Sequence, residues 1–378
     1  MDFRLTDEQQ MVQKTVRDFA TKRLAPVADE IDRKQEFPRA NFKGLSELGL
    51  TGIGIPAEYG GSGGDKVSAV LAIEECGKAC ASTAVILDSH LLLCIEPLFI
   101  FGTEEQRQRF VTPLARGEKV GAFAITEPEA GSDISAIKTT AVRDGDAYLL
   151  NGSKIFITNG DVADTIVVFA GVPELGKRGM TAFIIENGMP GFSRGKKFDK
   201  VGMRAGTSAE LLFKDCRVPA ANRLGAEGEG MRICLATLDR GRFGIAAQAL
   251  GITQAILEKS VEYSKQRVQF GAPISQNQSI SFRLADIATQ LEAARLLNYK
   301  AAFLCDQGEP FSTNAAMAKL TASELCMRAA VEGIQIFGGY GYMMDSPMQR
   351  YFRDAKLTTI YEGTSEVQRM VISRAILR

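Results

Sequence analysis

The sequence predicts an α+β protein of several domains, with helices at both ends of the chain and a β-rich segment between them. The 378 residues exceed what one small hydrophobic core organises. Apolar residues recur at helical spacing up to about residue 116 and again after residue 229, whereas short β-rich runs fill the middle. We therefore expect an N-terminal α-helical domain over 1–119, a middle antiparallel β-barrel or sandwich over 120–226, and a C-terminal domain like a four-helix bundle over 227–378.

The N-terminal domain opens with a helical pattern. The run "DEQQMVQKTVRDFATKRLAPVADEI" repeats apolar residues every three or four positions, and Asp7 and Glu8 stand at its start. The glycines of "YGGSGGD" (Tyr59 to Asp65) interrupt this pattern. No strand precedes them, as a phosphate-binding loop in a β-α-β unit requires, so we interpret them as a turn.

The middle segment alternates strand and turn signals. The runs "TIVVFA" and "MTAFIIE" predict strands, and "RDGDA", "NGSK" and "ENGMPG" predict turns. "GVPELGKR" has the glycine and lysine spacing of a P-loop, but Arg178 replaces the required Ser or Thr and a strand follows instead of a helix. We therefore reject a P-loop.

Three long helical patterns follow in the C-terminal domain. They are "MRICLATLDRGRFGIAAQALGITQAILEKSVEYSKQR", "ISFRLADIATQLEAARLLNYKAAFL" and "NAAMAKLTASELCMRAAVEGIQIF". Their lengths and apolar stripes predict a helical bundle that is suited to pairing with a copy of itself.

The composition excludes several classes of function. Lys plus Arg and Asp plus Glu number 45 each, so no net charge favours nucleic acid or an anionic membrane. We expect no uninterrupted apolar stretch long enough to span a bilayer, and "MDFRLTDEQQ" has no signal or transit peptide pattern. The seven cysteines contain no C-x-x-C pair, which favours reduced thiols and a cytoplasmic location. With His90 as the one histidine, we expect neither a metal site nor a Ser-His-Asp triad.

Three segments could carry chemistry, and each has a plain alternative. "AFAITEPEAGSD" (Ala122 to Asp133) offers hydroxyls and backbone amides at a strand end, or is an acidic surface loop. "KIFITNG" (Lys154 to Gly160) could place a planar ligand against an aromatic side chain and a hydroxyl, or is a hairpin strand. "QIFGGYGY" (Gln335 to Tyr342) permits close backbone approach to a ligand, or is a tight turn.

The segment "IYEGTSEVQR" (Ile360 to Arg369) places one acid before a final helix. Thr364 or Ser365 can cap that helix, whose free amides would favour a nearby phosphate. Glu362 follows an apolar pair, and dry surroundings raise the pKa of a carboxyl group, as a general base for a weakly acidic C–H requires. A solvated or salt-bridged acid before a helix is an equally weighted alternative from these residues alone.

These segments together resemble the acyl-CoA dehydrogenase family, most closely the bacterial short-chain, butyryl-CoA type. The resemblance covers nearly the whole chain in order and rests on "AITEPEAGSD", "FITNG", "LDRGRFGIAAQALG", "RVQFGAPI", "QIFGGYGY" and "RDAKLTTIYEGTSEVQR". It implies a three-domain, FAD-dependent enzyme that binds acyl-CoA, passes electrons to an electron-transferring flavoprotein and often assembles as a tetramer of two dimers. FAD would lie between the β-domain and the C-terminal bundle.

The resemblance also implies a set of site residues. FAD contacts within the subunit match Phe123, Ile125, Thr126, Gly131, Ser132, Phe156, Ile157 and Thr158, with Phe156 where the family usually has Trp. Contacts to the neighbouring subunit's FAD match Arg267, Phe270, Gln278, Gln335, Ile336, Phe337, Gly338 and Gly339. Positions near the diphosphate and ribose match Thr364 and Glu366. Positions around the CoA thioester match Ser132, Asp239, Arg240, Gly241, Arg242 and Gly363.

Glu362 matches the family's catalytic base. The implied reaction removes the pro-R α-proton with Glu362 while a β-hydride passes to flavin N5, which yields a trans-2-enoyl-CoA. The thioester oxygen would accept hydrogen bonds from a flavin ribityl hydroxyl and from the N–H of Glu362. Branched-chain and long-chain relatives place the base at the position of Gly241, which cannot act as one, so a straight short or medium acyl chain is favoured.

Several alternatives stay open. The same fold could run in reverse as an enoyl-CoA reductase or react directly with oxygen as an oxidase, and ring-bearing or branched acyl groups are not excluded. A non-catalytic CoA-binding or scaffold protein predicts loss of the base or of the flavin contacts, and both are retained.

Overall fold

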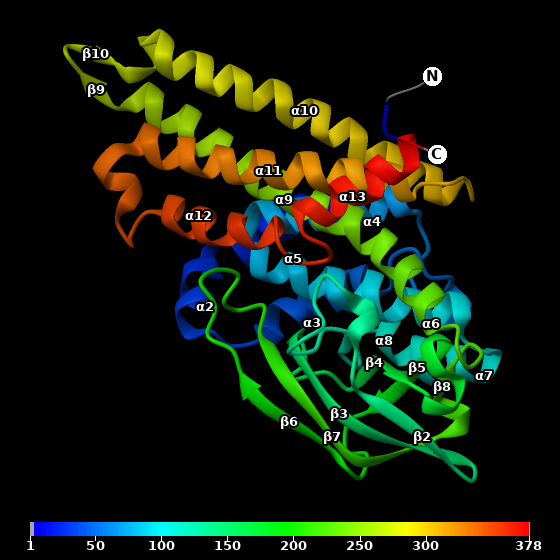
Figure 1. The fold of residues 1–378 in the computed structure, drawn as a ribbon. Coiled ribbons are helices and arrows are strands. Elements are labelled where there is room, and N and C mark those ends of the chain that lie inside the picture. Colours follow the sequence, from blue (N-terminus) through cyan, green and yellow to red (C-terminus); the bar gives the residue numbers. More distant parts are fainter. Residues whose placement is uncertain (1–3, 378) are drawn as a thin grey trace.

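The computed structural model describes residues 4–377, which form three groups of elements in chain order (Figure 1). The first group is helical, with short π-helical and 3-10 turns between its helices. Its α-helices are α1 (Asp7–Phe19), α2 (Ala28–Lys34), α3 (Arg39–Glu47), α4 (Lys66–Ala79), α5 (Ala81–Asp88), α6 (Glu96–Phe101), α7 (Glu104–Gln106) and α8 (Thr112–Ala115).

The centre of the helical domain is one long apolar segment. Ala81–Phe101, which comprises α5, the π-helical turn Ser89–Ile95 and α6, has the length and composition to cross a membrane, with a mean hydropathy of 1.9. The segment is not an uninterrupted apolar stretch, because Asp88, His90 and Glu96 lie within it. Moreover, 83% of that window is buried inside the protein, as in a core helix. His90 lies within it as a neutral structural residue, because burial lowers its pKa to about 4 and Nδ1 accepts the Gly121 N–H at 2.9 Å.

The middle domain is an eight-stranded sheet in the order β6-β7-β3-β2-β4-β5-β8, with β1 paired to β4. The α+β class predicted above is confirmed, although β1–β4 and β2–β4 are parallel pairs. The turn predicted at "NGSK" was wrong, because these residues lie inside β3 at an irregularity in its pairing with β7. The strands are β1 (Gly121–Ala124), β2 (Thr140–Asp144), β3 (Ala147–Thr158), β4 (Thr165–Gly171), β5 (Met180–Glu186), β6 (Phe192–Lys197), β7 (Ser208–Pro219) and β8 (Arg223–Leu224).

The C-terminal group is a bundle of long helices. In Figure 1, α9, α10 and α11 run across one end of the molecule, the sheet lies at the other end, and α4 and α5 lie between them. The elements are α9 (Gly230–Gln266), the hairpin β9 (Val268–Gln269) and β10 (Ala272–Pro273), α10 (Gln278–Asp306), α11 (Ser312–Phe337), α12 (Pro347–Thr358) and α13 (Ser365–Ile376).

Close helix packing joins the N-terminal helices to the bundle. A Cβ atom on Gly251 of α9 would lie 2.2 Å from the Glu74 carbonyl oxygen of α4, and one on Gly77 of α4 would lie 2.9 Å from the Gln248 carbonyl oxygen. The largest buried apolar cluster includes Leu71 of α4, Phe169 of the sheet and Phe243 of α9. The three groups of elements therefore share one core, which fixes their loops relative to one another.

Candidate active site

The loop from Tyr361 to Thr364, called here the 361–364 loop, connects α12 to α13 and is held by side chains from three helices. Lys319 Nζ of α11 donates to the Gly363 carbonyl at 2.7 Å. Gln368 Nε2 of α13 donates to the same carbonyl at 2.8 Å and to that of Glu362 at 3.2 Å. Tyr361 Oη donates to Gln248 Oε1 of α9. These contacts fix the loop backbone from both sides.

The fixed loop places Glu362 in a conformation that side-chain-bearing residues rarely adopt. Its φ is +51°, and it is one of seven non-glycine residues with positive φ within residues 4–377. Phe156 and Phe270, which the sequence also assigned to the site, belong to this group. Such backbone strain persists only where the surrounding structure enforces it, and it concentrates at functional sites.

The Glu362 carboxyl group packs against α9. Its Oε2 is buried and accepts no hydrogen bond from a donor within the described chain. A Cβ atom on Gly241 would lie 1.9 Å from this oxygen, so only glycine at 241 leaves room for it. Burial raises the pKa of Glu362 to about 7, against the opposing effects of the neighbouring Asp88 and of the charges of Lys319 and Arg242.

Asp88, the last residue of α5, is a second acid at this position, and sequence analysis missed it. Burial and the neighbouring Glu362 charge raise the pKa of Asp88 well above its ordinary value. The two carboxyl groups lie against neighbouring glycines of α9, Asp88 Oδ1 at Gly244 and Glu362 Oε2 at Gly241. The available signal was an aspartate inside the apolar run "STAVILDSHLLL", where a buried charge is costly unless it is neutralised or paired.

A buried ion pair holds the predicted flavin loop of the β-domain. Lys154 Nζ lies 2.6 Å from Glu127 Oε1, and both side chains are almost fully buried. Glu127 also accepts the N–H groups of Lys138 and Thr139, at 2.5 and 3.1 Å. The Ile155 N–H donates to the Thr126 carbonyl at 2.9 Å, which joins the loop after β1 to β3.

The end of β3 presents an aromatic side chain to the outside. Phe156 is 59% exposed at φ +58°, and its ring lies 4.8 Å from that of Phe198, centroid to centroid. Thr158 is half-buried, whereas the side chain of Ile157 packs into the sheet core. Of the loop residues assigned to FAD, Phe123 and Ile125 are buried, Thr126 is half-buried, and Gly131 and Ser132 are exposed.

The strand end and Glu362 meet at α5. Asn159, next to Thr158, donates from Nδ2 to the carbonyl oxygens of Ile86 at 3.2 Å and Gly121 at 3.1 Å. Ile86 lies two residues before Asp88, which contacts Glu362. The end of β3 and the Glu362 loop therefore both contact α5.

The α9 residues assigned to the thioester differ in their partners. Arg242 is buried and donates to the carboxylate of Asp239. The Arg240 side chain lies 3.1 Å from the carboxylate of Glu96 in α6, which also pairs with Lys66. Gly241 and Gly363 border Glu362 directly.

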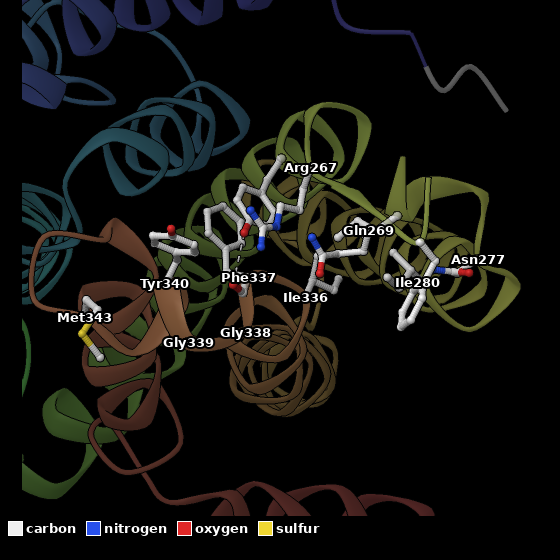
Figure 2. Close-up of a pocket in the computed structure, with 13 residues that line it drawn as sticks. Arg267, Gln269, Asn277, Ile280, Ile336, Phe337, Gly338, Gly339, Tyr340 and Met343 are labelled. Atoms are coloured by element: carbon white, nitrogen blue, oxygen red, sulfur yellow. Dashed lines mark hydrogen bonds between the residues drawn. The ribbon is translucent and has the colours of Figure 1, made fainter. Parts of the chain in front are cut away.

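A pocket of about 640 Å³ opens where α9 and α11 end (Figure 2). The Arg267 guanidinium lies 5.7 Å from the centre of the Tyr340 ring, and Phe270 is fully exposed. The exposed Gln278 and Gln335 are not among the lining residues. The predicted FAD residues that line it are Arg267, Phe270, Ile336, Phe337, Gly338 and Gly339.

A second hollow of about 480 Å³ lies at the start of α13. Thr364 caps this helix by accepting the Val367 N–H at 3.3 Å, and Glu366 follows in its first turn. Both residues line the hollow together with the cationic side chains of Arg328 and Lys356. Cations beside a helix N-terminus suit a phosphate group.

Models of three protein domains match the chain in order. They are the acyl-CoA dehydrogenase N-terminal domain over residues 6–118, the middle domain over 122–216 and the C-terminal domain over 228–377. The chain belongs to the acyl-CoA dehydrogenase family. It is an oxidoreductase of that family, and FAD is its cofactor.

The chain is similar to curated short-chain members over its full length. It is 49% identical over 379 residues to "Acyl-CoA dehydrogenase, short-chain specific" of Clostridium acetobutylicum, with 100% of each chain covered. It is also 49% identical over 381 residues to "Acryloyl-CoA reductase (NADH)" of Anaerotignum propionicum, covering 100% of this chain and 96% of the relative.

Solved structures show the same fold. Butyryl-CoA dehydrogenase from Megasphaera elsdenii matches with a TM-score of 0.98 and 51% identity, and all of both chains is covered. A chain from the structure reported as "Electron transferring flavoprotein of Acidaminococcus fermentans: Towards a mechanism of flavin-based electron bifurcation" matches with a TM-score of 0.99 and 52% identity, also over all of both chains. "PigA with FAD and proline" matches with a TM-score of 0.96 and 32% identity, covering 100% of this chain and 99% of the other.

Proposed function

We propose that this acyl-CoA dehydrogenase oxidises a short, straight-chain acyl-CoA to the trans-2-enoyl-CoA, with Glu362 as the base that removes the α-proton. The observation that carries the proposal is the Glu362 carboxyl group, fixed against Gly241 with an unpaired buried oxygen and a pKa of about 7. A base with a pKa near the working pH is partly ionised and yet a strong proton acceptor.

The residues of the site fit both an acyl thioester and FAD. FAD, when bound, supplies the acceptor for the β-hydride. Within residues 4–377 the N–H of Glu362 donates to no protein acceptor, so it is free for a thioester oxygen. A hydrogen bond at that oxygen stabilises the negative charge that develops there as the α-proton leaves. Lys319 and Gln368 keep this N–H and the carboxyl group in place through the loop backbone.

Two features support a homo-oligomer, for which we propose a tetramer of two dimers. Arg267 and the glycines 338–339 line a pocket whose wall includes the fully exposed Phe270, and the neighbouring Tyr340 and Tyr342 are 65% and 75% exposed. Apolar surface of this kind marks an interaction site. A second copy that places its FAD in the pocket would cover these side chains.

The relatives support proposals for the physiological partner and for the direction of the reaction. The likeness to a chain in the Acidaminococcus structure supports an electron-transferring flavoprotein as partner. The acryloyl-CoA reductase relative supports the reverse reaction, reduction of an enoyl-CoA, as the second candidate. The cytoplasmic location stays a prediction from the cysteines, all seven of which are free and six of which are buried.

An anaerobic titration followed by product analysis tests the proposal. The purified holoprotein is mixed with butyryl-CoA, octanoyl-CoA and isobutyryl-CoA, and the flavin band near roughly 450 nm is recorded. We expect complete bleaching with butyryl-CoA, weaker response to the others, and crotonyl-CoA as product. A yellow protein that no acyl-CoA bleaches, but that crotonyl-CoA reoxidises after chemical reduction, would favour the reductase. A protein inert in both directions contradicts the proposal.

A further inference from the structure

Asp88 is a buried acid beside Glu362 to which the proposed mechanism gives no task. It ends α5, a helix whose residues are all buried, and its exposed fraction is 0%. Neither of its carboxyl oxygens accepts a hydrogen bond from a donor within the described residues. An unpaired buried carboxylate is costly, so the group requires either a proton or a partner.

The surface of α9 is shaped around both acids. Gly241 and Gly244 are three residues apart and therefore lie on the same face of the helix. A Cβ atom on Gly244 would lie 1.8 Å from Oδ1 of Asp88, just as one on Gly241 would lie 1.9 Å from Oε2 of Glu362. Two glycines thus leave adjoining spaces that the two carboxyl groups fill.

The two acids have neighbours of opposite charge, an anionic one near Asp88 and cationic ones near Glu362. Glu96 of α6 acts on Asp88 and disfavours its negative form. Lys319 of α11 and Arg242 of α9 act on Glu362 and favour its negative form. Both acids also act on the phenol of Tyr361, on the 361–364 loop, whose pKa burial raises. This arrangement favours a proton on Asp88 and a negative charge on Glu362.

We propose that Asp88 holds the single proton of this carboxyl pair and donates it as a hydrogen bond to the Glu362 carboxylate, which orients the base and keeps it ionised. The inference rests on the proposed role of Glu362. Asp88 is a positioning residue: it acts through Glu362 and needs no contact with substrate. A neutral donor is the group that can offset burial of a carboxylate without adding a second charge.

Two variants of similar size test whether Asp88 acts as a hydrogen-bond donor or only occupies space. Asp88→Asn keeps a donor, whereas Asp88→Leu removes it. The rate of flavin bleaching by butyryl-CoA is measured in anaerobic single turnovers from about pH 5.5 to 9 for the wild-type holoenzyme and both variants. On the acidic side the rate falls as the base is protonated, and we call this part of the pH profile the acid limb. We expect the apparent pKa of the acid limb to stay within about half a pH unit of wild type in D88N, and to rise by about one unit or more in D88L.

Infrared difference spectra give a reading that does not depend on turnover. At neutral pH, ordinary carboxyl groups are ionised. The wild-type minus D88N spectrum should therefore show the C=O band of one protonated carboxylic acid. A carboxylate band in its place, or a D88N acid limb that moves to lower pH, would mean that Asp88 is ionised and would overturn the proposal. An unmoved limb in D88L would also overturn it.

The controls distinguish this inference from the proposed function. If wild-type enzyme is not bleached by butyryl-CoA, or if Glu362→Gln is bleached as fast as wild type, the assignment of the base fails. The infrared spectrum still decides which acid carries the proton. If bleaching requires Glu362 but neither Asp88 variant changes the limb or the spectrum, only the Asp88 inference fails.

Discussion

The 361–364 loop and the pocket at the ends of α9 and α11 are both site regions, yet they are built in opposite ways. Each contains a non-glycine residue with positive φ, Glu362 in one and Phe270 in the other. The loop that carries Glu362 is fixed by contacts from three helices, and Oε2 of Glu362 is buried. Phe270 is fully exposed. If the proposed roles hold, one chain completes the proton-transfer centre alone but leaves the far end of the proposed cofactor site open.

Removing the Glu362 carboxylate from the 361–364 loop should have the largest effect. Glu362→Gln keeps the size of the side chain but cannot accept the α-proton, so we expect flavin bleaching by butyryl-CoA to slow by about 10²- to 10⁴-fold. Stopped-flow absorbance under nitrogen measures the rate. Glu309→Gln, on the exposed turn after α10, is the matched control and should stay near wild type. Comparable rates in the two variants would exclude Glu362 as the base.

Adding a Cβ atom next to the Glu362 carboxyl group should have the next largest effect. In Gly241→Ala the new Cβ atom would lie 1.9 Å from Oε2 of Glu362, so the carboxyl group must move. We expect roughly a 10²-fold slower bleaching rate, since displacement of a reacting group by about 1 Å costs that much. The double variant G241A/E362D, with a shorter acid, should lose less than the product of the two single losses. Strictly multiplicative losses would show that residue 241 acts elsewhere.

A substitution in the pocket at the ends of α9 and α11 should lower the affinity for FAD and leave the rate of the chemical step unchanged. Arg267→Ala removes a cation from its lining, and we expect roughly tenfold weaker FAD binding. Fluorescence titration of deflavinated protein measures the affinity, and Lys265→Ala, two residues earlier and exposed, is the control. At saturating FAD the bleaching rate should match wild type. A slower saturated rate in R267A would mean that this pocket belongs to the reaction centre.

The smallest effect is on stability, and its sign depends on pH. The pKa of Glu362 is about 7 in the folded protein, above the ordinary value of 4.5. The folded state therefore binds more protons than the unfolded state between these values, and stability falls as pH rises through that window. We expect E362Q to be more stable than wild type by about 1–3 kcal/mol at pH 8 and equal to it below about pH 4.5. Denaturant unfolding at both pH values measures this, and equal stabilities at pH 8 would contradict the raised pKa.

Motif-bearing segments were predictable because local sequence fixes their shape. The helix after Thr364, the strand ending at Thr158 and the long α9 follow from capping, β-rich runs and apolar periodicity, and the structure contains all three. The turn assigned to "NGSK" failed because a β-bulge uses the same residues as a turn. Ala81–Phe101 has the length and hydropathy of a membrane helix, yet most of it is buried inside the protein, so apolar length alone does not separate a core helix from a membrane helix.

The residues that surround Glu362 and hold its loop were not predictable, because they come from distant parts of the chain. Asp88 of α5 acts on Glu362, Gln248 of α9 accepts from Tyr361 and Lys319 of α11 donates to the Gly363 carbonyl, and no local pattern brings them to this loop. Only tertiary packing does so. Gly241 could be read as a vacant base position, but its second role, leaving room for the Glu362 carboxyl group, required the structure.

The pH dependence of a single turnover tests the central claim most directly, because it reports the ionisation of the base itself. The rate of flavin bleaching by saturating butyryl-CoA is recorded anaerobically at constant ionic strength. With Glu362 as a buried base, the rate should fall about tenfold per pH unit below an apparent pKa of about 7 and level off above it. A rate that stays constant down to about pH 5, as expected for an ordinary solvated glutamate, would contradict the account.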